Sequence, residues 1–272
     1  MPHKTILSFD VEEFDTPLEY GKNLPMDEQM RVSETGLRAV LGLLEAHQAT
    51  ATFFTTANFA LHHPELIREI SRTHEIASHG YHHSSFENAD LQKSRDVLEN
   101  LIQKPVTGYR MARMMPVDEL EIAKAGYLYN SSLHPTFVPG RYNHLSKPRT
   151  PFWKEGVLQI PASVTPGVRF PVFWLSFKNF PLAWIKLATR RIWKADGCVN
   201  LYFHPWEFAD ISDKGRFGLP FYVSRHSANG AMILKLERYI VWAKKQSEFT
   251  TFADWYQILA ARPLPDYSET AK

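Results

Sequence analysis

Three histidines stand within five residues in the stretch EIASHGYHH, which covers Glu75 to His83. His79 and His83 are separated by three residues, a spacing that brings both imidazoles to one side of a turn or of a helix start. Two imidazoles and a carboxylate form a common ligand set of catalytic zinc sites, which keep a fourth position open for water. The stretch therefore predicts part of a metal centre.

The acidic stretch FDVEEF, which follows the first short apolar run, supplies candidate carboxylates. Side chains alternate along a strand, so Asp10 and Glu12 are expected on the same face. Glu12, His79 and His83 would then provide three protein ligands. A metal held by them lowers the pKa of bound water to roughly 7 and polarises a carbonyl. The alternative interpretation is a pair of unrelated surface acids.

Two more residues capable of chemistry end predicted strands. Arg110 ends the strand in TGYRMARMM, and His204 ends the strand in LYFHPWEF. Taken alone, such an arginine is most simply a solvated or salt-bridged residue, and a histidine before proline is most simply packed. Tyr109 and Trp206, which lie beside them in the chain, are the aromatic residues expected to contact a substrate.

Short β-branched or aromatic runs alternate with helix-like segments, the pattern of βα units around a parallel sheet. Strands are predicted at residues 5–9, 51–55, 75–78, 106–110, 127–131, 158–162, 199–203 and 248–252. Apolar periodicity predicts helices around 37–44 and 91–101, and Pro116 opens another that Gly126 closes. Seven or eight such units predict a distorted (β/α) barrel, an α/β fold whose active site lies at the carboxyl ends of the strands.

The length of 272 residues fits one such domain spanning residues 1–272. Two segments, 134–153 and 169–194, lack the repeating pattern, and strand-like runs resume after each. They are therefore predicted to be insertions in the domain rather than linkers.

The composition excludes several functions. Thirty-one basic against 29 acidic residues leave a formal charge of +2, too balanced for a chain whose main work is binding nucleic acid. Cys198 is the only cysteine, which excludes an internal disulfide and a thiolate metal cluster. The N-terminal stretch lacks a secretory signal pattern, and no run of 18 apolar residues predicts a membrane span. We therefore expect a cytoplasmic protein.

Taken in chain order, the motifs resemble those of the polysaccharide deacetylase family, the carbohydrate esterases with a NodB-like domain. The family has an acidic motif, a His-x-x-x-His motif, an arginine motif and a late Leu-x-x-His motif. Here these read FDVEE, HGYHH, GYRM and LYFH, and the resemblance covers Thr5 to Phe208. It implies a NodB-like barrel that removes an N-acetyl group from an amino sugar in a polysaccharide or lipid-linked glycan.

The resemblance also implies roles for individual residues. The implied ligands of one divalent metal ion, expected to be Zn²⁺, are Glu12, His79 and His83. Asp10 is implied as the general base, Arg110 as the residue that orients it, and His204 as the general acid toward the leaving amine.

Other interpretations stay open from the residues alone. His82 replaces His83 as a ligand if the histidine loop is not helical. A deformylase or amidase would use the same constellation on another N-acyl or a non-sugar substrate. A silent glycan-binding module would keep only the fold, and a glycosidase using Asp10 with a second carboxylate would need no metal.

The segment 169–194 contains seven aromatic residues, six basic residues and no acid. Aromatic anchors interleaved with positive charge fit a segment in the interface of an anionic membrane. The alternative is a helix packed on the barrel, with Lys and Arg stems extending to solvent. The membrane interpretation adds peripheral contact at the inner face of the membrane, and the residues it assigns to the lipid are Phe173, Trp174, Phe177, Phe180 and Trp184.

Overall fold

The computed structural model describes residues 2–139, 142–218 and 230–268. Its strands are β1 His3–Val11, β2 Thr52–Thr55, β3 Glu75–Ser78, β4 Gly108–Tyr109, β5 Tyr129–Asn130, β6 Phe137–Val138, β7 Tyr142–Asn143, β8 Phe152–Lys154, β9 Val157–Gln159, β10 Cys198–Phe203 and β11 Ser247–Phe249. Its α-helices are α1 Met26–Ala46, α2 Ala57–His62, α3 Pro64–Ile70, α4 Ala89–Ile102, α5 Glu119–Lys124, α6 Trp174–Asn179, α7 Leu182–Asp196, α8 Lys214–Phe217, α10 Ala231–Ala243 and α11 Phe252–Ala260. Three 3₁₀ helices join them: η1 Thr16–Tyr20, η2 Ala112–Met114 and η3 Pro205–Phe208.

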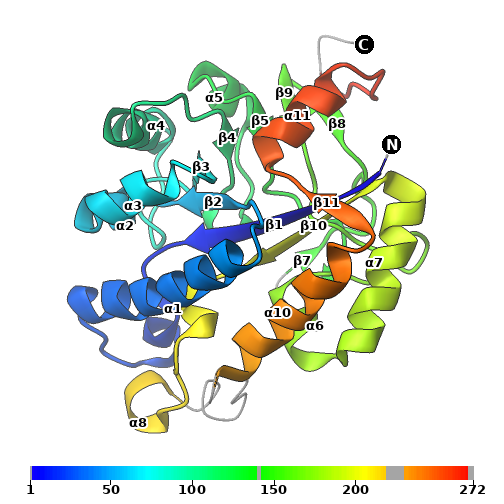
Figure 1. The fold of residues 1–272 in the computed structure, drawn as a ribbon. Coiled ribbons are helices and arrows are strands. Elements are labelled where there is room, and N and C mark those ends of the chain that lie inside the picture. Colours follow the sequence, from blue (N-terminus) through cyan, green and yellow to red (C-terminus); the bar gives the residue numbers. More distant parts are fainter. Residues whose placement is uncertain (1, 140–141, 219–229, 269–272) are drawn as a thin grey trace.

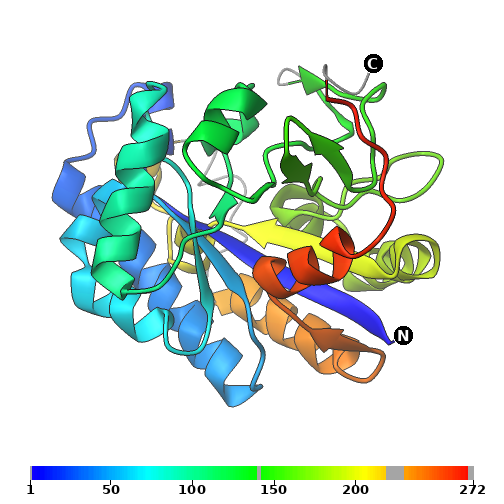
Figure 2. The ribbon, with the colours of Figure 1, turned by 90° about the horizontal axis from the view of Figure 1, so that it is seen from above.

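One curved sheet organises the molecule. Its strand order is β10-β1-β2-β3-β4-β5-β9-β8, and β11 pairs with the start of β1. These pairs are parallel except the pair of β8 with β9. Helices surround the outside of the curve, as Figure 1 shows, and Figure 2 gives the view from above.

The curved sheet is an open, distorted barrel. Within the described ranges no ladder joins β10 to β8. At this seam the backbone amide of Asn200 in β10 donates to the Ser163 hydroxyl at 2.8 Å. The predicted α/β barrel of βα units is therefore confirmed in an unclosed form.

All eight predicted strands are present; β3 has the predicted bounds, and the others have shifted ends. The predictions at 106–110, 127–131, 158–162 and 248–252 each share only two residues with the observed strands β4, β5, β9 and β11. The helix predicted from Pro116 begins at Glu119 instead, because the Asp118 side chain caps it by accepting from the Leu120 amide at 2.9 Å. Gly126 follows the helix with φ +82°, as its predicted role requires.

The two segments predicted as insertions differ in structure. Segment 134–153 contains the β6–β7 ladder, and 140–141 within it lie outside the described residues. Segment 169–194 contains α6 and most of α7, and the Thr189 hydroxyl of α7 lies 3.1 Å from the Tyr239 hydroxyl of α10. Because α7 leads into β10 and packs on the helix layer, it is one of the regular covering helices. In the described part of the chain, no helix has the length and apolar character needed to cross a bilayer.

The inner side of the sheet changes from apolar to polar along the strands. On the inner face, Phe252 and Trp255 of α11 pack with apolar residues of the strands, which are Ile6, Phe54, Ala77, Tyr129 and Leu158. Further along β1 the same face carries Ser8, Asp10 and then Glu12, because side chains alternate. Both faces of β1 are covered, so these polar groups lie buried at the mouth of the barrel.

A close contact between α1 and η3 supports one side of this mouth. Gly36 of α1 faces the backbone of Pro205, the residue after His204. A Cβ atom at Gly36 would lie 1.8 Å from the Pro205 carbonyl oxygen. Glycine is therefore required at this position for the helix to pack so closely.

Candidate metal centre and active site

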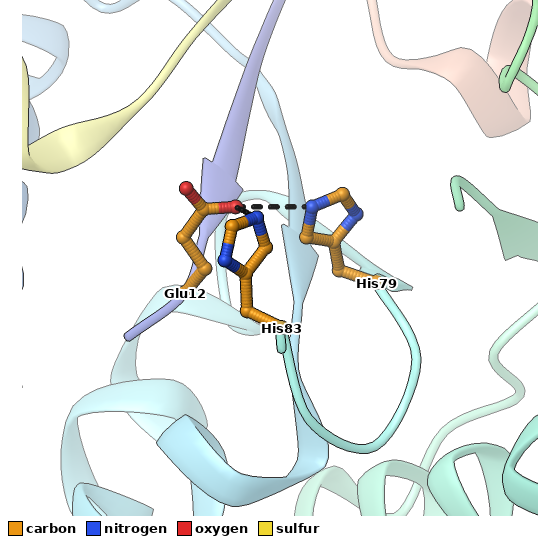
Figure 3. A group of neighbouring side chains, drawn as sticks. All are labelled: Glu12, His79 and His83. Carbon is orange, nitrogen blue, oxygen red and sulfur yellow. Dashed lines mark hydrogen bonds and ion pairs between the residues drawn. The ribbon is translucent and has the colours of Figure 1, made fainter. Parts of the chain in front are cut away.

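Glu12, His79 and His83 converge at the carboxyl end of the strands (Figure 3). The Nε2 atoms of His79 and His83 lie 3.1 Å and 3.2 Å from the same oxygen, Glu12 Oε2. All three residues are buried. Glu12 comes from the end of β1, His79 directly follows β3, and His83 comes from the loop beyond it.

The other nitrogen of each imidazole has an acceptor. His79 Nδ1 lies 2.8 Å from the Arg110 carbonyl oxygen, and His83 Nδ1 lies 2.8 Å from Asp15 Oδ1. A carbonyl oxygen and a carboxylate only accept, so each Nδ1 carries the proton and donates it. In the neutral, metal-binding form of each imidazole the Nε2 lone pair lies beside the Glu12 oxygen, and without a metal a proton on Nε2 can take that place. Such a buried set of three electron-pair donors fits a divalent cation, with outer partners of the kind that orient metal-binding histidines.

The charges within the cluster also favour a cation between these side chains. Burial favours the neutral form of Glu12, but the charges of His83 and His204 and the hydrogen bond from His79 hold its pKa well below the ordinary value. Burial likewise opposes a charge on His83, but Glu12 and Asp15 raise its pKa to about 9. Two acids thus stabilise positive charge at this point, whether a proton or a metal ion carries it.

The histidine loop is held by the start of α2. Gly80 has φ +85°, a conformation that turns the chain sharply after His79. The backbone amides of Ala57 and Asn58 donate to the carbonyls of Gly80 and Tyr81 at 3.0 Å and 2.9 Å. The first turn of a helix has amides without internal partners, and here they anchor the loop.

Glu13 and His82 lie outside the cluster. Glu13 accepts from the Thr56 hydroxyl at 2.9 Å and from the Asn58 side chain at 2.6 Å, so it ties β1 to α2. The His82 side chain is 44% exposed and lies 3.8 Å from Glu13. The loop is not helical, yet His83 rather than His82 meets Glu12.

Asp10 is held in place by Arg110. The guanidinium Nη1 donates to Asp10 Oδ1 at 2.6 Å and to the Ser8 hydroxyl at 3.1 Å, and Nε donates to the Ser131 carbonyl at 3.3 Å. The guanidinium also lies over the Phe54 ring, 3.9 Å from its centroid. A fully buried cation with this many partners fixes the orientation of the carboxylate beside it.

His204 faces Asp10 across the mouth. Its Nε2 lies 4.0 Å from Asp10 Oδ2, its Nδ1 lies 3.8 Å from Glu207 Oε2, and its ring stacks on Trp206 at 4.9 Å. Burial disfavours the imidazolium, but the carboxylates of Glu12, Glu207 and Asp10 outweigh it and raise the pKa of His204. His204 therefore holds a proton more readily than a free histidine.

Trp206 and Tyr109, the two residues predicted to contact a substrate, are both buried. The Trp206 indole donates to Glu12 Oε1 at 3.1 Å, so it is a buried partner of the carboxylate behind the site. Tyr109 is fully buried against Tyr127 at a centroid distance of 5.2 Å, which corrects the expectation that it contacts a substrate. The reason is alternation along β4: since Arg110 points inward, Tyr109 points to the helix layer.

A pocket of about 250 Å³ opens beside the candidate base and acid. Its lining includes Asp10, His204, Tyr142, Tyr202, Phe173 and Trp174. A neighbouring pocket of about 610 Å³ shares Met114 with it and reaches the ends of β5 and β9. The site therefore opens into an aromatic pocket with a larger space next to it.

The pocket also corrects the membrane assignment of several aromatic residues. Phe173 and Phe177 are buried and Trp174 is half-buried, so these three pack on the barrel or line the pocket. Phe180 and Trp184 remain 41% and 48% exposed. Only these two of the five residues predicted to face lipid lie on the surface.

Sequence reasoning missed two carboxylates. Asp15 lies in the chain after β1, and its partners are His83 and Arg113, whose Nη2 lies 3.0 Å from Asp15 Oδ2. No spacing rule connects it to a histidine far along the chain. Glu207 stands three residues after His204, and that spacing in PWEF was the available signal.

Comparison with known proteins agrees with the histidine and arginine motifs. Residues 24–118 match the sequence model of the family described as "Polysaccharide deacetylase". Over 63 residues the chain is 33% identical to peptidoglycan-N-acetylmuramic acid deacetylase PdaA of Bacillus subtilis (strain 168). That match spans 23% of this chain and only 24% of the relative. The resemblance to the polysaccharide deacetylase family is confirmed.

Solved structures share the fold along nearly the whole chain. A protein described as a polysaccharide deacetylase from Mycobacterium smegmatis has a TM-score of 0.65 at 20% identity, covering 97% of this chain and 92% of that chain. Another so described, from Pseudomonas aeruginosa PAO1, has a TM-score of 0.66 at 16% identity, covering 94% and 93%. The PuuE allantoinase has a TM-score of 0.62 at 18% identity, covering 97% and 95%. At such identities the likeness establishes the NodB-like fold.

Proposed function

We propose that the protein is a metal-dependent hydrolase that removes an N-acetyl group from an amino sugar within a glycan. The observation that supports it most is the meeting of three electron-pair donors, Glu12 Oε2 and the Nε2 atoms of His79 and His83. The Asp10–Arg110 pair and His204 lie beside this cluster. The family match and the deacetylase PdaA among its relatives support acetylated sugars as the substrate class.

The residues divide the reaction between them. A divalent ion held by Glu12, His79 and His83, with Zn²⁺ the best fit, would polarise the amide carbonyl when bound. Asp10 accepts a proton from the water whose oxygen attacks the carbonyl carbon. As the carbon–nitrogen bond breaks, His204 donates its proton to the leaving nitrogen, and acetate and a free amine result.

Arg110 acts on Asp10 rather than on substrate. Its bond to Oδ1 leaves Oδ2 facing His204 and the pocket. A base held in this orientation needs no rearrangement as the proton moves, which lowers the barrier.

Acetate release tests the proposal. N-acetylated oligosaccharides should yield acetate, a strong chelator should stop the reaction, and added Zn²⁺ should restore it. Formylated sugars and simple acylated amines belong in the same screen, because faster turnover of either would replace the deacetylase with the deformylase or amidase alternative. Metal-loaded protein that hydrolyses none of these would favour a silent glycan-binding module.

A matched pair of variants tests the ligand set. Purified protein should contain about one divalent ion per chain, as a three-ligand site predicts. His79→Ala with His83→Ala should lose it, whereas His82→Ala, in the same loop, should retain it. Full metal content in the double variant would rule out this cluster as the metal site.

A further inference from the structure

Two neighbouring helices have unusual solvent-facing stripes. In α7 the exposed stripe consists of Trp184, Leu187, Arg191 and Lys194, and in α10 it consists of Leu234, Arg238 and Val241, followed by Lys245 in the turn after the helix. Spacings of three and four residues keep each stripe on one side of its helix. We call these two stripes the α7–α10 surface.

The two helices that carry the stripes are adjacent. Figure 1 shows α7 and α10 side by side, and Trp193 stacks on Trp242 between them at 5.2 Å. Trp184 and Leu234 are 48% and 50% exposed, so each stripe presents a large apolar side chain to solvent.

The charge of this surface has one sign. Each stripe contributes two cations and no acid, in a chain whose formal charge is only +2. The acids nearest in sequence have partners of their own: Glu237 lies 3.1 Å from His47, and Asp196 lies 2.6 Å from Arg149. The surface therefore combines exposed apolar side chains with uncompensated positive charge.

Helix α4 and part of α1 differ from α7 and α10 on their outer side. The exposed residues Gln92, Lys93, Asp96 and Asn100 of α4 are polar and of mixed charge. On α1, Arg38 pairs with Glu34 at 2.7 Å. The combination of exposed apolar residues and cations on α7 and α10 is therefore not found on α4.

The apolar end of this surface adjoins the active-site pocket. Helix α6 begins at Trp174, which lines the pocket with Asp10 and His204, and its six residues span about 9 Å. Phe180 follows directly, is 41% exposed, and packs edge-on against Phe170 at 5.0 Å. Trp184 lies in the first turn of α7.

We propose that the α7–α10 surface docks the protein on the anionic headgroups of a phospholipid bilayer. Trp184 and Phe180 enter the headgroup region, while Arg191, Lys194 and the α10 cations pair with lipid phosphates. Docking through the end nearest the pocket would present a lipid-linked glycan to Asp10 and His204, and only this last step rests on the proposed function. The protein would then act at a membrane surface, to which it is attached peripherally.

Vesicle binding tests the surface directly. Vesicles of phosphatidylglycerol in phosphatidylcholine should co-sediment the protein at low ionic strength and release it as salt rises, while pure phosphatidylcholine should bind it weakly. Phe180→Ser with Trp184→Ser should weaken binding without changing turnover of a soluble N-acetylated oligosaccharide. Arg191→Gln should lower affinity roughly fivefold, the factor expected for one basic residue near an anionic surface, and Lys93→Gln on α4 should leave it unchanged.

Trp184 also provides a direct readout, because it is the exposed one among the chain's seven tryptophans, all within the described residues. Lipids brominated on the acyl chain should quench part of the tryptophan fluorescence in wild type, and Trp184→Phe should abolish that quenching.

Several results would overturn the docking. One is no vesicle binding at low ionic strength, and another is equal binding to neutral and anionic vesicles. The others are a loss of affinity in Lys93→Gln as large as in Arg191→Gln, and binding to soluble dextran sulfate but not to vesicles. Vesicle binding without acetate release from any substrate would refute the proposed function and leave the docking standing.

Discussion

Asp15 is predicted to set the metal affinity of the site although it touches no metal. Its Oδ1 accepts from His83 Nδ1 at 2.8 Å, and its Oδ2 lies 3.0 Å from Arg113 Nη2. The bond to His83 fixes the tautomer that leaves Nε2 free for a metal and makes that nitrogen a better donor. Removing the acceptor should leave a buried N–H without a partner and let the ring turn.

The expected loss of metal affinity depends on which side chain replaces Asp15. Loss of such an outer partner usually costs 10- to 100-fold in metal affinity, and we expect about 100-fold for Asp15→Ala. Asp15→Asn should cost about 10-fold, because its amide oxygen still accepts the hydrogen bond but carries no charge. Competition with a chromogenic chelator in zinc-buffered solution measures both values.

Glu19→Gln is the matched control. Glu19 also pairs with Arg113 but does not contact His83, so its loss disturbs the arginine and spares the imidazole. We expect metal affinity within about twofold of wild type, as for a surface ion pair. If Asp15→Ala binds zinc as tightly as wild type, or if Glu19→Gln loses as much, orientation of His83 by Asp15 is not the cause.

Three further predictions follow from the site and its supports. Asp10→Asn and His204→Ala should each keep the metal while the rate of acetate release falls by about 10² to 10⁴, and wild-type turnover would remove that residue from the mechanism. Gly36→Ala should destabilise the fold by about 1–3 kcal/mol in urea unfolding and slow turnover with metal still bound, because its Cβ would displace Pro205. Burial lowers the pKa of His134 to about 3, so protonation in the unfolded state alone should cost about 2 kcal/mol of stability between pH 7 and pH 5. In His134→Gln this loss should disappear, and an unchanged pH dependence would show that other groups cause it.

The strand ends were predictable because two simple regularities act together. Parallel strands bring their carboxyl ends to one edge, and alternation then selects which residues face inward. These rules place Asp10, Glu12 and His79 on one face from the sequence alone. The same alternation, applied to β4, would have excluded Tyr109 once Arg110 was assigned to the inside.

Contacts between elements far apart in the sequence were not predictable in this way. The close approach of Gly36 to Pro205 depends on how α1 crosses η3, and no local pattern in either segment encodes it. The segment containing α6 and α7 shows a related limit. Its composition predicted aromatic residues facing a membrane, but Phe177 fills the core while Trp184 stays outside, because a helix has two sides and composition does not distinguish them.

The four acids of FDVEEFD show why residue type alone did not assign the roles. Glu12 meets two imidazoles, Asp10 meets a buried guanidinium, Glu13 meets a hydroxyl and an amide of α2, and Asp15 meets His83 from behind. All four are buried carboxylates within six residues, so their chemistry differs only through their partners. Exchanging a carboxylate for its amide at each position should therefore have four different effects: loss of metal at Glu12, loss of rate at Asp10, loss of stability at Glu13, and weaker metal binding at Asp15. Measuring metal content, turnover and unfolding on the same four variants separates these outcomes, and a uniform loss of all three properties would mean that the stretch acts only as a structural unit.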